Sequence, residues 1–351
     1  MHIALQIFTA DKRRGGMERY THDLAEALIA RGEKVTTLAT RFAHDWPGER
    51  MTARVCSVDV RALQYEQFAK ATVPDSVVHA MQPVAHADVY TPHSGFVPTL
   101  YDCGGPLRRF ANRLNLKRRV VRQTEAKLIT GRPLIACLSR RQAADAKQAY
   151  PTIDHRLHVI HHGVDLDHFD PTNRPAVREK FRTDYGIPAG APLVLFISQN
   201  FRRKRLDVAI DALRLGKHHL LVVGRDSPTG YERHFGQVHF VGALPDALPA
   251  HAAADALILP TLDEPFGLVV LESIAMGNPV VLYHTAGATE MVVDGATGRV
   301  VREDNPIAWR EALREVIADR AGWRARCLAA RDSLSFDRHV DALMHLYRDV
   351  R

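Results

Sequence analysis

The sequence predicts an α/β protein built from two doubly wound domains, each with a parallel sheet. Short apolar runs of strand length alternate with helical patterns in both halves, which is typical of parallel sheets covered by helices. The chain has 351 residues, enough for two domains with cores of their own. A polar, proline-bearing segment, Asp170–Pro175, separates the two halves.

Periodicity locates the elements of the first half. A pattern over residues 20–28 predicts a helix, and residues 106 to about 130 read as one long helix. Asp88–Gly95 reads as a strand that runs into a loop carrying His93. The other strands expected here are residues 3–8, 35–39, 55–58, 76–80, 134–138 and 157–160.

The second half repeats this architecture without repeating the sequence. The strands expected there are residues 193–197, 220–223, 238–241, 256–259 and 279–282. We expect a Rossmann-like domain over residues 1–168 and a second over residues 169–335. Residues 336–351 read as a last helix that packs back on the first domain.

The composition is that of a globular protein, with 46% hydrophobic and 25% charged residues. No apolar run reaches the length of about 18 residues that a transmembrane helix needs, and the first residues lack the features of a signal peptide. The four cysteines lie far apart, which favours a reducing cytoplasm and disfavours a structural zinc site. The net charge of +7 comes from residues 1–150, which hold 23 Lys and Arg against 14 Asp and Glu. This asymmetry favours an anionic partner.

The stretch Pro260–Pro279 follows a predicted strand and changes to helical spacing, so we expect a helix from near Pro265 or Phe266. Glu264 stands at its start, and Glu272 lies about two turns further on, on roughly the same side. The first N–H groups and the dipole of such a helix suit an anion such as phosphate. Taken one at a time, these residues also fit an ordinary helix with an acidic cap. The phosphate donors expected are the N–H groups of Phe266, Gly267 and Leu268.

Two other loops follow predicted strands. Gly15 and Gly16 precede the first helix, and the basic run Arg202–Arg205 lies between a strand and a helix. Ligands of doubly wound sheets bind beyond the carboxyl ends of the strands, so we expect both loops and the helix described above to line a central cleft between two facing domains. The glycine loop would supply backbone donors, and Arg203 and Lys204 would supply charge for a diphosphate. The glycines do not form a G-x-G-x-x-G fingerprint, which disfavours a dinucleotide.

These residues resemble the signatures of one family. Glu264 and Glu272, separated by seven residues and followed by Gly277–Val281, are similar to the E-x7-E signature of the retaining GT-B glycosyltransferases of family GT4. Within that family the sequence most resembles the lipopolysaccharide core glucosyltransferases that add the first glucose to inner-core heptose. Other segments similar to family motifs are Gly15–Arg19, Ile160–Phe169, Arg203–Lys204 and Gly287–Gly298.

The resemblance covers nearly the whole chain, with four departures. Arg205 stands where the family has glycine, His162 where it has asparagine, and Ala288 where it has a second glycine. Ser198 and Gln199 occupy the place of a Gly-Arg pair, so Arg202 or Arg203 must supply one diphosphate contact.

The resemblance implies a role for each matching residue. Glu272 would bind the ribose hydroxyls of a nucleotide, and Glu264 would bind hydroxyls of the transferred sugar. Arg203 and Lys204 would neutralise the diphosphate as it leaves, and Gly16 would contact its distal phosphate. The N–H groups named above would help to hold the sugar or the phosphate.

His93 would lie near the reacting carbon, so we assign catalytic roles to Glu264, His93 and Lys204. His93 alone also fits a structural loop histidine. No Asp-x-Asp metal motif follows a strand, so we expect Lys and Arg to replace Mg²⁺ and the enzyme to need no metal or other cofactor. No second nucleophilic carboxylate is evident, and the route of retention stays open.

Residues 107–122 interleave basic and apolar side chains. This pattern predicts docking to an anionic membrane, with an ordinary surface helix as the alternative. The basic residues expected to contact the membrane are Arg108, Arg109, Arg113, Lys117, Arg118 and Arg119.

The sequence therefore predicts a cytoplasmic, peripheral-membrane hexosyltransferase of bacterial type. It would move glucose, as first candidate, from a UDP sugar to a lipid-linked saccharide such as lipopolysaccharide core. The alternatives are a sugar-nucleotide epimerase or hydrolase of the same fold, and a non-catalytic nucleotide-binding module. No nucleic-acid recognition motif is present. The nucleobase, the sugar, the acceptor and the oligomeric state stay open.

Overall fold

The computed structural model describes residues 1–56, 60–101, 105, 110–112, 114–214, 216–231 and 236–350. The chain divides into two compact units: Met1–His161 with His339–Arg351, and His162–Arg338. The division falls between His161 and His162, earlier than the boundary expected at residue 168. The C-terminal residues group with the first unit.

Within the described residues, the first unit contains a seven-stranded parallel sheet in the order β3-β2-β1-β4-β5-β6-β7. The chain begins in the middle of the sheet and winds outward on both sides, as in doubly wound folds. β1 is central and mostly buried, and this explains the apolar run at residues 3–5 within it. The strands are β1 (His2–Gln6), β2 (Lys34–Ala39), β3 (Glu49–Thr52), β4 (Val77–Ala80), β5 (Val89–Tyr90), β6 (Leu134–Cys137) and β7 (Leu157–Val159).

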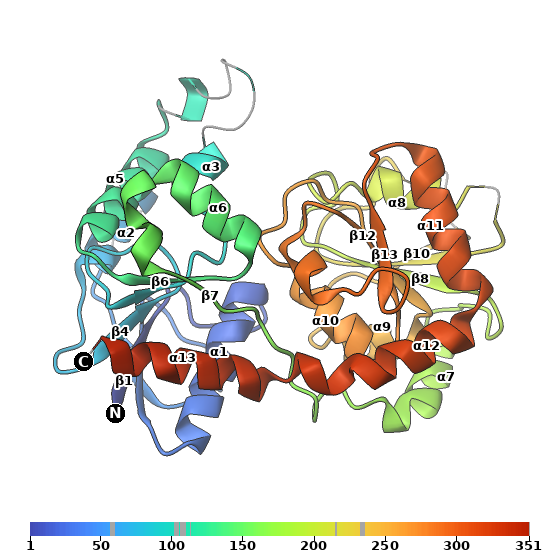
Figure 1. Ribbon diagram of the computed structural model, residues 1–351, viewed down its shortest axis with the longest axis horizontal. Coiled ribbons are helices and arrows are strands. Elements are labelled where there is room, and N and C mark those ends of the chain that lie inside the picture. The colour runs from blue at the N-terminus through green and yellow to red at the C-terminus, as the bar shows by residue number, and fades with distance from the viewer. Residues whose placement is uncertain are drawn as a thin grey trace. The chain divides into compact units, whose positions relative to one another are not determined.

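Helices cover both faces of this sheet. Figure 1 shows α2, α5 and α6 on one face and α1 and α13 on the other. The helices are α1 (Gly16–Ala30), α2 (Arg61–Lys70), α3 (Val97–Tyr101), α5 (Leu116–Thr130), α6 (Arg140–Ala149) and α13 (Phe336–Asp349), with a 3-10 helix at Pro151–Arg156.

Buried hydrogen bonds attach α13 to the first unit. The Tyr20 hydroxyl on α1 lies 2.8 Å from His339 Nε2, and His339 Nδ1 lies 2.7 Å from the His161 carbonyl oxygen. The Tyr347 hydroxyl lies 2.7 Å from Nδ1 of His79, a residue of β4. Polar partners that are far apart in the sequence therefore fix the last helix against the sheet.

Within the described residues, the second unit contains a six-stranded parallel sheet in the order β10-β9-β8-β11-β12-β13. Its strands are also mostly apolar runs, because helices cover both faces. The strands are β8 (Leu193–Ile197), β9 (His219–Val223), β10 (Val238–Phe240), β11 (Ala256–Leu259), β12 (Val280–Tyr283) and β13 (Gly298–Val301).

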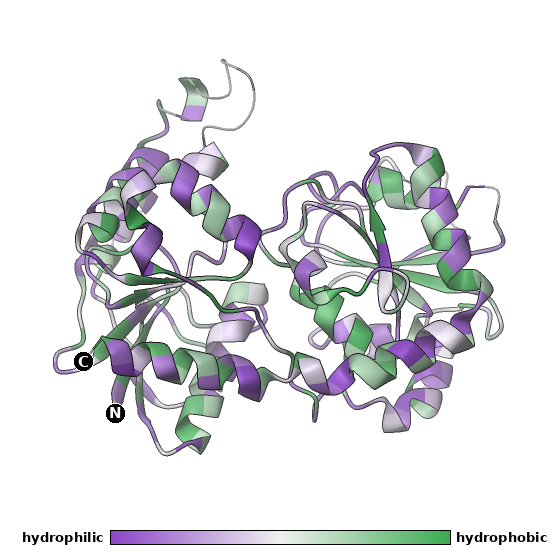
Figure 2. Cartoon of the chain, viewed as in Figure 1, coloured by the Kyte–Doolittle hydropathy of each residue, from purple (hydrophilic) through white to green (hydrophobic). Residues whose placement is uncertain are grey.

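In Figure 1, α8 and α11 cover one face of this sheet, and α9, α10 and α12 lie on the other. The hydropathy colouring of Figure 2 shows hydrophobic strands in both units. Phe196, Ile258 and Trp309 are fully or nearly fully buried in the core between the sheet and α8 and α11. The helices are α7 (Arg174–Asp184), α8 (Leu206–Ala212), α9 (Leu248–Ala253), α10 (Leu268–Ala275), α11 (Pro306–Ala318) and α12 (Arg320–Ala330), with 3-10 helices at Pro171–Asn173, Gly287–Met291 and Arg331–Leu334.

Two expectations about elements of the first unit differ from the structure, and two strands were missed. The long helix expected from residue 106 is not continuous, because Asn115 is extended and caps a new helix, α5, by accepting the Arg118 N–H at 3.0 Å. Residues 55 and 56 of the expected strand 55–58 are not in a strand, and residues 57–58 lie outside the described residues. Two edge strands, β3 and β13, were not expected.

Candidate functional site

Lys204 and Arg203 lie in the loop after β8, in different environments. Phe201 is buried and its N–H donates to the Asp226 carboxylate at 2.8 Å, while the Asn200 side chain accepts the Arg203 N–H at 2.8 Å. These contacts fix the turn. Lys204 is only 9% exposed, whereas Arg203 is exposed. The predicted basic run is therefore divided into a buried ammonium and an exposed guanidinium.

Arg205, which replaces the glycine of the resembled family, has the left-handed backbone that glycine favours, with φ 61° and ψ 54°. A side chain costs about 1–2 kcal/mol in this conformation. The guanidinium forms an ion pair with Asp304 at 2.9 Å and lies 3.4 Å from the Pro260 carbonyl oxygen. The loop thus has a glycine-type backbone, and a carboxylate offsets the added charge.

Glu264 lies in the loop between β11 and α10, where a second loop holds it. Its backbone pairs with Ala286, and its carbonyl oxygen accepts the Gly287 N–H at 3.0 Å. A Cβ atom on Gly287 would stand 2.0 Å from the Pro265 carbonyl oxygen, so a side chain there would displace the backbone. Gly287 therefore permits the close approach that positions Glu264.

The N-terminus of α10 offers uncommitted backbone donors. The helix starts at Leu268, two residues after the later start that was expected, Phe266, because Gly267 (φ 102°) is its N-cap. The His162 ring packs edge-to-face on Phe266, with centroids 5.0 Å apart. The N–H groups of Phe266, Gly267 and Leu268 have no acceptor among the described residues. These donors and the positive end of the helix dipole suit an anion.

The side chains of Lys204 and Glu264 meet beside this helix start as an ion pair between Nζ and Oε2. Burial and the neighbouring Arg203 guanidinium lower the pKa of Lys204 to about 7. The pair brings a cation that suits phosphate next to a carboxylate that suits sugar hydroxyls. The sequence predicted both residues for the same ligand, and the structure brings them into contact.

Glu272 lies on α10 and is only 7% exposed. Its Oε2 atom lies 3.2 Å from Nε2 of His251, a fully buried residue of α9. The His251 carbonyl oxygen in turn accepts from the Asn278 side chain at 2.6 Å. His251 was missed from the sequence, since no motif marks a histidine within the alanine-rich segment of α9. The structure therefore shows a carboxylate with a histidine at one of its oxygens.

In the first unit, Gly15, Gly16 and His93 lie near the start of α1. Gly15 is the N-cap with an extended backbone that any residue adopts, and Gly16 is the first helical residue. Tyr20, one turn later, packs on the His93 ring with centroids 4.5 Å apart. Burial lowers the pKa of His93 well below its usual value, so the ring is neutral near pH 7. His93 can take part in hydrogen bonds there, but it carries no charge.

The basic segment predicted to contact a membrane is partly described. Lys117, Arg118 and Arg119 are exposed in the first turn of α5. Three apolar side chains close to them in the sequence are exposed as well: Phe110, Leu114 and Leu116. The other basic residues of the prediction lie outside the described residues: Arg108, Arg109 and Arg113. Among the helices that the structure describes, none has the length and apolar character to span a membrane.

One group of side chains has the geometry of a metal site. His22, Asp23 and Glu26 on α1 have candidate ligand atoms within 4.8 Å of one another. The Lys12 ammonium lies 3.4 Å from His22 Nε2, and its charge opposes a cation there. This group lies outside the residues predicted for the reaction.

Two family models match the chain, one in each half. Residues 14–168 match the family model described as Glycosyltransferase Family 4, and residues 191–319 match the model described as Glycosyl transferases group 1. The two matches together cover more than half of the chain. The chain belongs to the family 4, group 1 glycosyltransferases.

Curated relatives agree with this family. The D-inositol 3-phosphate glycosyltransferase of Geodermatophilus obscurus is 28% identical, over 95% of this chain and 84% of that protein. The D-inositol 3-phosphate glycosyltransferase of Xylanimonas cellulosilytica is 30% identical, over 64% of this chain. The chain spans only 58% of the Xylanimonas protein's length.

Solved structures show the fold. WaaG, a glycosyltransferase involved in lipopolysaccharide biosynthesis, has a TM-score of 0.81 at 23% identity, with 97% of this chain and 98% of that chain covered. Anabaena HepE, solved in complex with UDP and glucose, has a TM-score of 0.71 at 18% identity, with 99% and 100% covered. The predicted GT-B fold with two parallel sheets is confirmed.

Proposed function

We propose that this glycosyltransferase moves a hexose, with retention, from a nucleoside-diphosphate sugar to a lipid-linked saccharide such as lipopolysaccharide core. UDP-glucose is the first candidate donor. The observation that carries the proposal is the contact between Lys204 and Glu264 beside the uncommitted N–H groups of α10. The fold shared with WaaG and with the UDP- and glucose-bound HepE supports the choice of donor and acceptor.

In the proposed reaction, the bond between the sugar C1 and the diphosphate oxygen breaks, and negative charge develops on the diphosphate. Lys204, Arg203 and the α10 N–H groups would stabilise that charge, which is a large term in such reactions. Glu264 would exchange its ion pair with Lys204 for hydrogen bonds from sugar hydroxyls. Glu272 would accept from the ribose hydroxyls, and Gly16 would contact the distal phosphate.

The acceptor hydroxyl forms the new bond to C1 and must lose its proton. We propose that the leaving phosphate takes this proton on the same face of the sugar, since we assign no carboxylate as a second nucleophile. His93 is proposed as a neutral hydrogen-bonding contact near the reacting carbon, in keeping with its lowered pKa.

We also propose that no divalent metal takes part, because Lys204, Arg203 and the α10 N–H groups would take the place of Mg²⁺ at the diphosphate. The test is transfer activity after dialysis against EDTA, which we expect to equal the untreated activity. Loss of activity that Mg²⁺ restores would contradict this part of the proposal.

A thermal-shift panel of nucleotide sugars tests the donor. We expect UDP-glucose to stabilise the protein more than the other nucleotide sugars, since it is the proposed donor. A ligand at 100 times its dissociation constant stabilises a protein by about 2.7 kcal/mol. Glu264→Gln and Lys204→Met should each lower the transfer rate about 100-fold or more, as loss of one transition-state contact does. Lys180→Met, at an exposed ion pair on α7, is the matched control and should retain full activity.

The acceptor is tested with two substrates. Heptose-terminated lipopolysaccharide core represents the proposal, and inositol 3-phosphate represents the reaction in the curated relatives' names. We expect transfer to the first. Transfer to inositol 3-phosphate alone would overturn the proposed acceptor and retain the glycosyltransferase activity.

Membrane docking is proposed for the basic start of α5, because cationic and apolar side chains close together in the sequence are exposed there. Cosedimentation with acidic liposomes should fall when Lys117, Arg118 and Arg119 are changed to Gln. A matched triple variant in the second unit should bind like the unaltered protein: Lys180→Gln, Arg214→Gln and Arg314→Gln. Equal liposome binding by both triple variants would refute this site.

Two other functions remain to be separated by experiment. An epimerase or hydrolase would convert the donor when no acceptor is present, and we expect no such product. A non-catalytic binding module would bind the donor without any transfer. Transfer by the unaltered chain, lost in Lys204→Met with the fold intact, would exclude the module.

A further inference from the structure

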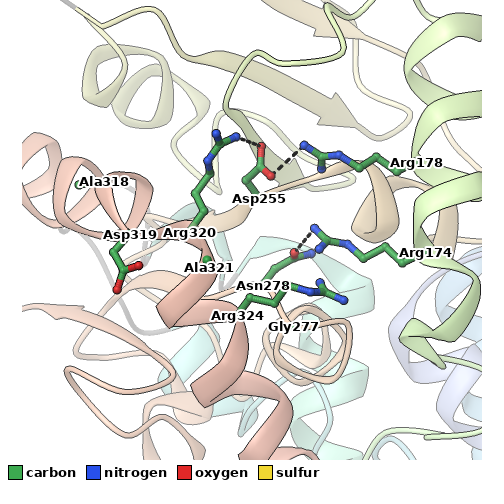
Figure 3. A pocket seen from close by; sticks show the side chains of 10 residues that line it. All are labelled: Arg174, Arg178, Asp255, Gly277, Asn278, Ala318, Asp319, Arg320, Ala321 and Arg324. Carbon is green, nitrogen blue, oxygen red and sulfur yellow. Dashed lines mark hydrogen bonds and ion pairs between the residues drawn. The ribbon is translucent and has the colours of Figure 1, made fainter.

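A pocket of about 500 Å³ lies in the second unit (Figure 3). Asp255 directly precedes β11, and Asn278 lies just before β12, so the pocket opens at the amino ends of these strands. Lys204 and Glu264 follow the carboxyl ends of strands in the same sheet. The pocket is therefore at the opposite edge of the sheet from the candidate donor residues. Two helices contribute its arginines: Arg174 and Arg178 from α7, and Arg320 and Arg324 from α12.

Few carboxylates face these guanidiniums. Asp255 accepts from Arg178 at 2.9 Å and from the buried Arg182 at 3.1 Å, and Arg320 lies 3.5 Å from it. Asp319, the other acidic residue of the pocket, caps α12, and its carboxylate points away from Asp255 in Figure 3. The lining therefore carries more positive than negative charge.

Backbone carbonyl oxygens accept hydrogen bonds from three of these four guanidiniums. Arg174 and Arg178 donate to carbonyl oxygens at the end of α9, and Arg324 donates to the Met276 carbonyl oxygen at 2.9 Å, just beyond α10. Such contacts are common at helix C-termini. Arg320 has no such contact with a carbonyl oxygen in the part of the chain that the structure describes, and its side chain is 42% exposed. Its ion pair to Asp255 is its single hydrogen-bonding contact among the described residues.

The arginines also repel one another. Burial lowers the pKa of Arg174, and the guanidiniums of Arg324 and Arg178 lower it further. Burial and Arg178 act in the same direction on the pKa of Arg324. A bound anion would relieve this repulsion, because each guanidinium would gain an opposite charge.

We propose that this pocket binds a soluble small molecule through a phosphomonoester, with Arg320 and Arg324 as its principal contacts. A phosphomonoester carries a charge of about −1.5 to −2 near pH 7, which matches the excess of four lining arginines over two lining carboxylates. Planar guanidinium forks suit phosphate oxygens. The volume is within the range of small-molecule sites, so it leaves room for the organic part of the ligand. This binding site goes beyond the proposed transfer reaction and does not depend on it.

Titration calorimetry tests the site. The probes are inorganic phosphate and glycerol 3-phosphate at constant ionic strength, with glycerol as the uncharged control. Variants separate this pocket from the donor region, which could also bind phosphate. Arg320→Gln with Arg324→Gln alters the pocket, Lys204→Met alters the donor region, and Arg314→Gln is a matched exposed arginine on α11.

We expect phosphate to bind at this pocket in the unaltered protein, in Lys204→Met and in Arg314→Gln. The pocket double variant should bind glycerol 3-phosphate about tenfold more weakly or worse, since it lacks two charge-assisted contacts. If Arg324→Gln disturbs the fold, Arg320→Gln alone should still weaken binding. The proposal would be overturned if the pocket double variant and Arg314→Gln bound glycerol 3-phosphate with equal affinity. It would also be overturned if only Lys204→Met lost phosphate binding.

A second arm separates a soluble ligand from a lipid headgroup with the same chemistry. Vesicles containing phosphatidic acid should bind the unaltered protein and the pocket double variant equally. Loss of vesicle binding in the pocket double variant would overturn the assignment to a soluble ligand.

Discussion

Raising the pH should weaken donor binding through Lys204. Burial and Arg203 lower the pKa of this residue to about 7 in the protein, and a bound diphosphate should raise it again. Binding then requires the protonated form, so affinity is highest below the lowered pKa and falls as the pH rises above it. Between pH 7 and pH 8.5 the protonated fraction falls about 15-fold, which corresponds to roughly 1.6 kcal/mol of binding free energy.

The assay is calorimetric titration with a nucleotide sugar, UDP-glucose first, from pH 6.5 to pH 9. Both phosphates of a nucleotide sugar are diesters, so the ligand's phosphates do not titrate in this range. Repeating the titration in buffers of different ionisation enthalpy measures the protons taken up. Uptake should rise towards one proton per ligand as the pH passes 7.

Lys204→Met is the control, because it removes the titrating group. Its affinity should be weaker at pH 7 and should show little pH dependence, since Arg203 stays charged throughout. A flat profile in the unaltered protein would refute the reasoning. It would mean that the Glu264 carboxylate, in contact with Lys204, keeps the ammonium charged to pH 9.

Three further predictions concern stability. Arg205→Gly should be about 1 kcal/mol more stable to denaturant than Arg205→Ala, since both lose the side chain and only glycine favours the left-handed backbone; equal stability would contradict this. Gly287→Ala should destabilise the protein by about 1–3 kcal/mol and weaken donor binding, because the added Cβ atom would lie 2.0 Å from a backbone oxygen. Gly190→Ala is the control and should change neither stability nor donor binding, because a Cβ atom there has no neighbour within 4 Å. Burial lowers the pKa of His79 to about 3 and of His339 to about 4. The unfolded chain therefore binds more protons, and denaturant titrations at pH 8 and pH 5 should show a loss of about 4 kcal/mol at the lower pH; no loss would show that these rings protonate freely in the folded protein.

Much of the fold follows from sequence patterns. The central strands are buried on both faces, so they appear as apolar runs, and β8 and β11 lie where the sequence predicts them. The edge strand β3 is exposed throughout and has no apolar run, so periodicity does not identify it. The start of α10 was misplaced because Gly267, rather than an acidic cap, sets it.

The sequence proposes residues for the candidate site by their type, but it does not give their environments. The E-x7-E spacing identified Glu264 and Glu272, but it carries no sign of His251, which is distant in sequence and approaches from α9. Adjacent positions in a basic run look alike, yet Lys204 is buried and Arg203 is exposed, because the turn after β8 decides which side chain faces inward. Burial is the largest cause of the lowered pKa of Lys204, ahead of the adjacent Arg203, so the predicted pH dependence could not be derived from the sequence.

The departure at Arg205 shows why a family resemblance can hold where a motif does not. Buried Phe201 and the hydrogen bonds of Asn200 hold the backbone of the loop, which has the left-handed conformation at Arg205 itself. Arginine costs strain at this position, but its guanidinium pairs with Asp304 and does not add an unbalanced charge. Lys204, the preceding residue, therefore meets Glu264 although the family glycine is absent. Arg205 therefore keeps the glycine-type backbone of the loop, and the contact between Lys204 and Glu264 is present without the glycine.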